Sequence, residues 1–117
     1  GCGRLFEGTP VQMWHSLSKL AALPGDTIVC SGHEYTAANA KFALTIDPDN
    51  SALTSRTDEV NAARATGQPT VPTTLETERA TNPFLRAADP GIRAHLGLHN
   101  ASDAEVFTEI RARKDQF

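Results

Sequence analysis

One histidine in this chain stands where protein structures commonly place a ligand-binding side chain. His33 lies in the sequence CSGHEYT (residues 30–36), directly after an apolar stretch that predicts a strand over residues 27–31. A strand end fixes the backbone, and a neighbouring glycine lets the chain turn closely. A neutral imidazole there suits zinc or iron. A lone histidine is also a common half-buried residue, and one imidazole cannot hold zinc without further ligands. The adjacent Glu34 either supports His33 or caps the next helix.

Two cations near the end of the sequence form a second candidate group. Arg111 and Lys114 are three residues apart, so on a helix they share one face. Together they can bind a single carboxylate through charge-assisted hydrogen bonds. A basic last turn is also the ordinary complement of a helix dipole. The residues alone leave both interpretations open.

Local signals predict the elements that must position these groups. Thr9 and Pro10 are typical of a helix start, and apolar residues at three- and four-residue steps predict an amphipathic helix over residues 10–22. Pro24 and Gly25 then predict a turn before the strand. Beyond His33 the sequence predicts an extended segment at 68–73 and helices over residues 36–46, 51–66, 75–80, 90–97 and 103–114.

The predicted helices differ in which faces should be buried. Helix 36–46 is apolar on two sides, which is typical of a helix packed between other elements. Helix 51–66 should bury Leu53 and Val60. The last helix should begin after a Ser102 cap and bury three apolar residues, Val106, Phe107 and Ile110.

Composition excludes several classes of protein. The 117 residues suffice for one domain of ordinary size, and a net charge of -3 argues against a dedicated nucleic-acid or membrane-surface protein. No apolar run approaches the roughly 20 residues that span a bilayer, and no secretory signal pattern is present. Cys2 and Cys30 do not form a disulfide framework pattern and are expected to be reduced thiols. We therefore expect a cytoplasmic protein with no nucleic-acid or membrane partner.

Four further segments, taken with CSGHEYT in this order and at this spacing, resemble one enzyme family. They are GCGRLFEGT at residues 1–9, GQPTVPTTL at 67–75, TNPFLR at 81–86 and RARKDQF at 111–117. The chain resembles the back half of glyoxalase II, the hydroxyacylglutathione hydrolases of the metallo-β-lactamase superfamily. That family's metal-binding motif, Thr-His-x-His-x-Asp-His, does not occur in these 117 residues.

The resemblance implies a fold class and a division of the chain. The class is α+β, with the end of an αββα metallo-β-lactamase-like domain followed by a mainly α-helical C-terminal domain. Residues 1–34 would be the C-terminal piece of the first domain. Residues 35–117 would form the helical domain that binds glutathione.

The resemblance also implies roles for individual residues. His33 would ligate one of two metal ions, zinc with iron or manganese as alternatives, and border the substrate. The positions that contact the glutathione part of the substrate match four residues: Arg4, Tyr35, Arg111 and Lys114. Phe6 stands where some members have a tyrosine, so it can only pack, and the lost hydrogen bond is worth about 0.5–1.5 kcal/mol. No residue here is expected to be catalytic by itself.

The implied activity is hydrolysis of S-D-lactoylglutathione to glutathione and D-lactate, in methylglyoxal detoxification, by a complete and monomeric enzyme. The 117 residues alone, with one metal ligand, are expected to bind no metal and to be inactive. One alternative is another thioesterase or persulfide-handling enzyme on the same fold. The other is a non-catalytic helical module that binds glutathione-like anions or a protein. The basic C-terminal sequence favours glyoxalase II, because shorter relatives lack it.

Overall fold

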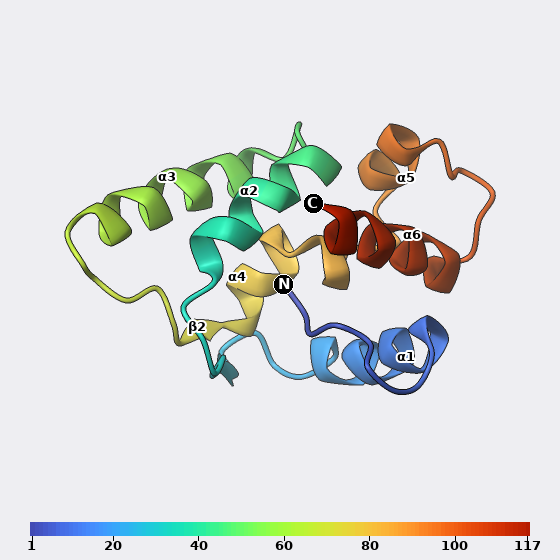
Figure 1. Cartoon of the computed structure of the whole chain (residues 1–117), viewed down its shortest axis with the longest axis horizontal. Coiled ribbons are helices and arrows are strands. Elements are labelled where there is room, and N and C mark those ends of the chain that lie inside the picture. Colours follow the sequence, from blue (N-terminus) through green and yellow to red (C-terminus); the bar gives the residue numbers. More distant parts are fainter.

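Six α-helices, a single 3-10 helix and a two-stranded sheet make up the chain, in a computed structural model that describes all of residues 1–117 (Figure 1). The elements follow in the order α1 (Pro10–Ala21), β1 (Ile28–Val29), α2 (Thr36–Ile46), α3 (Ser51–Ala65), β2 (Thr73–Thr74), α4 (Leu75–Thr81), η1 (Pro83–Leu85), α5 (Pro90–Leu96) and α6 (Asp103–Gln116). The mainly helical character predicted beyond His33 is confirmed. No helix combines the length and the apolarity that crossing a bilayer requires.

Side-chain caps explain where the helices begin. The Thr9 hydroxyl accepts a hydrogen bond from the Gln12 backbone N–H, while the Gln12 side chain accepts one from the Thr9 N–H. Ser102 and Glu105 form the same reciprocal arrangement at α6. Each arrangement satisfies backbone donors that the first helical turn leaves without partners. The predicted starts at residues 10 and 103 are therefore confirmed.

The core lies where α2, η1, α5 and α6 meet, and aromatic side chains dominate it. Phe84 lies between Phe42 and Phe107, with ring centroids 6.0 and 5.8 Å away. Trp14 of α1 approaches Phe107 to 5.8 Å, which attaches α1 to α6. The predicted stripe of α6 is confirmed, since its three residues are fully buried: Val106, Phe107 and Ile110.

The predicted strand over residues 27–31 is wrong in length. Only Ile28 and Val29 pair, antiparallel to Thr74 and Thr73 of β2. Because β2 is itself two residues long and is the only partner, no further ladder forms. Ile28 remains 59% exposed. The sheet thus serves to join residues near 28 to residues near 74 rather than to form a layer.

Replacing Phe107 by alanine should destabilise the chain strongly. The ring is fully buried between Phe84 and Trp14, and deleting a buried phenylalanine leaves a cavity that costs about 3–5 kcal/mol. Urea unfolding followed by the fluorescence of Trp14, the only tryptophan, measures the loss. The exposed neighbour Thr108 supplies the control, because Thr108→Ala should change stability by less than about 0.5 kcal/mol. Equal effects of the two substitutions would contradict the packing described.

Glu105 should make the stability of the chain depend on acidic pH. Hydrogen bonds from the Ser102 backbone and side chain lower the pKa of its carboxyl below the ordinary value. A lowered folded-state pKa stabilises the fold above the unfolded pKa, and this stabilisation is lost as pH falls through the folded value. Glu105→Gln keeps an amide oxygen for the Ser102 N–H but cannot titrate. Its urea midpoint should therefore fall less steeply than that of the parent between pH 7 and pH 3, and identical slopes would refute this role.

Candidate functional site

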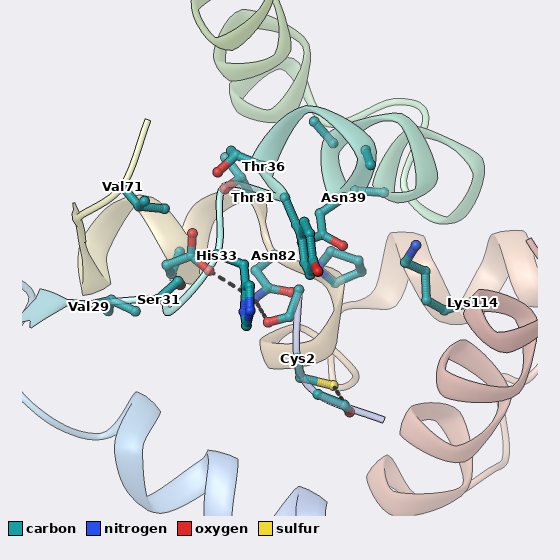
Figure 2. A pocket seen from close by; sticks show the side chains of 18 of the residues that line it. Cys2, Val29, Ser31, His33, Thr36, Asn39, Val71, Thr81, Asn82 and Lys114 are labelled. Carbon is teal, nitrogen blue, oxygen red and sulfur yellow. Dashed lines mark hydrogen bonds between the residues drawn. The ribbon is translucent and has the colours of Figure 1, made fainter. Parts of the chain in front are cut away.

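One cavity of about 960 Å³ gathers the side chains that the sequence singles out (Figure 2). Its walls come from residues 1–6, the segment after β1, the first turns of α2, the residues around Asn82 and the last turns of α6. All six predicted site residues line it: Arg4, Phe6, His33, Tyr35, Arg111 and Lys114. They come from three stretches of sequence, which only the fold brings together.

His33 and Tyr35 form the imidazole side of this cavity. Their rings stack in parallel, with centroids 5.0 Å apart and an interplanar angle of 8°. Both side chains are exposed, Tyr35 to 62%. No other side chain of the chain bonds to the His33 ring, so its nitrogens remain available to a ligand. No three histidine, cysteine or carboxylate side chains lie close enough together to hold a metal ion.

Arg111 is buried, and its donors are directed at the protein. Its side chain is 6% exposed, and Nη1 donates to the carbonyl oxygens of Cys2 at 3.0 Å and Gly3 at 3.3 Å. Nη2 donates to Asp115 at 2.8 Å, and the guanidinium lies 5.0 Å from the Phe84 ring centroid. The buried Nε alone has no partner. Arg111 therefore fastens residues 2–3 to α6, a structural task that its spacing from Lys114 did not indicate.

Lys114 is placed differently, although it lies three residues further along the same helix. Its ammonium is 5.5 Å from the ring centroids of Phe42 and Phe117, and no carboxylate pairs with it. Arg4 is 65% exposed, with Nε 3.8 Å from Asp115. A single carboxylate, Asp115, thus lies beside both arginines while Lys114 keeps its charge for a ligand. This edge of the cavity favours anions.

Two lining residues depart from what the sequence predicts. Phe6, which the sequence predicts to pack, is instead 89% exposed. Cys2 was not singled out for the site, but its thiol lies in the cavity wall 3.5 Å from the Arg111 guanidinium. Burial raises the pKa of this thiol, so at neutral pH it is protonated. Both cysteines are free, as predicted.

Asn82 supports the floor of the cavity. Its amide nitrogen donates to the carbonyl oxygen of Gly1 and to the carboxylate of Glu78, and its oxygen accepts from the Phe84 N–H. A buried asparagine whose donors and acceptor are all satisfied fixes the backbone around it. The Asn-Pro turn therefore has a structural role.

Taken together, these features define a mainly helical unit with one cation-edged cavity and an exposed imidazole on its wall. Residues 34–117 match the family model described as the hydroxyacylglutathione hydrolase C-terminus. Since this match covers more than half of the chain, the chain belongs to that family.

Curated relatives extend the similarity over all 117 residues. The chain is 74% identical to a hydroxyacylglutathione hydrolase of Roseobacter denitrificans and 69% identical to one of Ruegeria pomeroyi, covering 46% of each relative. It is 62% identical, over the same share, to a hydroxyacylglutathione hydrolase of Rhizobium meliloti. The chain therefore spans about half the length of these curated relatives.

Arg111→Lys should destabilise the fold more than Lys114→Met does. A lysine ammonium at position 111 cannot reach Cys2, Gly3 and Asp115 together, and each lost bond to a charged group is worth about 1.5–3 kcal/mol. Lys114→Met removes only two long contacts between its ammonium and aromatic rings, worth less than about 1 kcal/mol. Urea unfolding of both variants gives the comparison. If Lys114→Met lowered the free energy of unfolding more than Arg111→Lys does, Arg111 would not be the more important of the two residues for the fold.

Proposed function

We propose that this chain is the substrate-binding part of a hydroxyacylglutathione hydrolase, an enzyme that hydrolyses S-D-lactoylglutathione to glutathione and D-lactate. The observation that carries the proposal is the convergence of all six residues on one cavity. The family to which the chain belongs and the names of its relatives support the same activity. The substrate class is a thioester of glutathione with a 2-hydroxy acid.

The charges around the cavity suit glutathione. Glutathione carries two carboxylates and one ammonium, so its site needs fixed cations. Lys114 would bind one carboxylate directly, because its ammonium has no carboxylate partner of its own. Arg4 would add a second, exposed cation. Arg111 would act with Lys114 on that carboxylate through its positive charge, while its donors hold residues 2–3 and Asp115 in place.

His33 fits a metal ligand on the chemistry of its side chain. Its ring is exposed, has no partner within the chain apart from the stacked Tyr35, and lies on the wall of the cavity. It would supply one imidazole to a site of two metals, zinc with iron or manganese as alternatives, whose other ligands lie outside these 117 residues. Bound metals give a hydrolase of this kind Lewis-acid chemistry. The residues of this chain bind and orient the thioester beside them, which is a contribution of proximity.

The division of the chain follows from the same proposal. Residues 1–34 would complete a metallo-β-lactamase-like domain, and residues 35–117 would form the glutathione-binding domain. The start of the family match at residue 34 supports this boundary. Exposed apolar side chains support it too, since most of them precede the boundary: Phe6, Val11, Leu20, Leu23 and Ile28.

Substitutions at His33 and Lys114 in the full-length enzyme should separate metal binding from substrate binding. His33→Ala should lower metal content and kcat together, because it opens the ligand shell. Lys114→Met should raise KM roughly tenfold or more, through loss of a charge-assisted hydrogen bond, with metal content unchanged. Elemental analysis and steady-state kinetics with S-D-lactoylglutathione give both quantities.

A thioester that lacks the glycine carboxylate of glutathione provides the control. Lys114→Met should leave the KM for this shortened substrate almost unchanged, because the partner of the ammonium is missing. A parent enzyme that does not hydrolyse S-D-lactoylglutathione would refute the function. Normal metal content and rate in His33→Ala would remove His33 from the metal site.

A further inference from the structure

Glu34 makes two short side-chain hydrogen bonds next to the cavity, although it does not line the cavity itself. Its Oε1 accepts a hydrogen bond from the Thr70 backbone N–H at 2.6 Å, and its Oε2 accepts one from the Thr70 hydroxyl at 2.7 Å. Arg64 Nη1 lies 4.0 Å from Oε1. Thr70 is buried, with 8% of its surface exposed. Both carboxylate oxygens are therefore fixed by one residue, 36 positions away in the sequence.

The neighbours of Glu34 are the two ring residues of the cavity wall. His33 and Tyr35 both line the cavity, whereas Glu34 between them does not. The Glu34 carboxylate instead bonds to Thr70, while the two neighbouring rings stack against each other with centroids 5.0 Å apart.

Little else holds this segment. Upstream, β1 ends at Val29, which pairs with Thr73. Downstream, α2 begins after Tyr35, which gives no side-chain cap to the helix. Between these points Ser31, Gly32 and His33 are exposed. The hydrogen bonds between Glu34 and Thr70 are consequently the side-chain contacts that fix the backbone of residues 33–35.

We propose that Glu34 and Thr70 are positioning residues, which together hold His33 and Tyr35 in the orientation that the ligand site needs. The proposal rests on the proposed function, in which His33 ligates a metal and Tyr35 contacts the substrate. Glu34 touches neither. It acts by fixing the backbone on which both rings are carried, in the way that outer hydrogen-bond partners commonly orient metal-ligating side chains.

Substitutions on both sides of the contact test this in the full-length protein. Glu34→Ala removes both hydrogen bonds, Thr70→Val removes only the one from the hydroxyl, and Thr70→Ser retains both. Glu34→Ala should weaken metal affinity about 10–100-fold, the range typical of lost outer partners, and raise KM for the thioester. Thr70→Val should cause a smaller change in the same direction. Thr70→Ser should match the parent. If Glu34→Ala fails to fold, the comparison of Thr70→Val with Thr70→Ser tests the proposal.

Asp103→Ala is the matched control. It deletes a carboxylate that pairs with Arg93 between α5 and α6, away from the cavity. It should lower thermal stability while leaving metal affinity and KM unchanged. If the Glu34 and Thr70 variants behave in the same way as Asp103→Ala, the contact is merely structural and the proposal is overturned. In a His33→Ala background, Glu34→Ala should lower metal affinity no further, because both act through one ligand.

A direct measurement separates this inference from the function on which it rests. In protein with selectively labelled histidine and tyrosine, the NMR contact between the rings of His33 and Tyr35 should disappear in Glu34→Ala and persist in Thr70→Ser. Loss of the contact in a protein whose parent proves inactive would refute the function and retain the positioning role. A ring contact that survives Glu34→Ala would overturn the positioning role, whatever the activity.

Discussion

The buried guanidinium of Arg111 is the interaction on which the rest of the cavity depends. A charge that is almost wholly out of water is stable only when its donors are satisfied, and here two carbonyl oxygens, Asp115 and the face of Phe84 surround it. Through these contacts residues 2–3 are held against α6, and with Gly1 they form one wall of the cavity. That wall belongs to the same cavity as the rings of His33 and Tyr35, which precede α2, and the ammonium of Lys114 on α6.

Two basic residues of α6, Arg111 and Lys114, show how burial gives similar charges different roles. Arg111 offers a planar set of donors that several fixed acceptors can share, which suits a buried position. Lys114 carries a compact charge on a flexible stem, and it lies against two aromatic rings with no carboxylate partner. Arg111 therefore holds residues 2–3 in the wall of the cavity, whereas Lys114 remains available for a ligand.

The sequence predicts the helices well because caps and apolar periodicity are local signals. The starts at Pro10 and Asp103 depend on partners three residues away, and the buried stripe of α6 repeats within the helix. The residues of the site were found through family resemblance rather than through periodicity. The sequence does not reveal the long-range contacts. Pairing with β2 limits β1 to two residues, and the partner of Glu34 is Thr70. Nothing near residue 34 or residue 111 specifies partners 36 and 109 positions away.

The contacts of residues 1–3 also determine when the cavity can be completed during folding. The partners of these residues are Asn82 and Arg111, which are 81 and 109 positions further along the chain. Closing such long loops carries an entropic cost that only the final contacts repay. The contacts between α2 and α3 join neighbouring elements and can form early, whereas residues 1–3 cannot be fixed until α6 has packed. The cavity wall that residues 1–3 form is thus the last part of these 117 residues to be assembled.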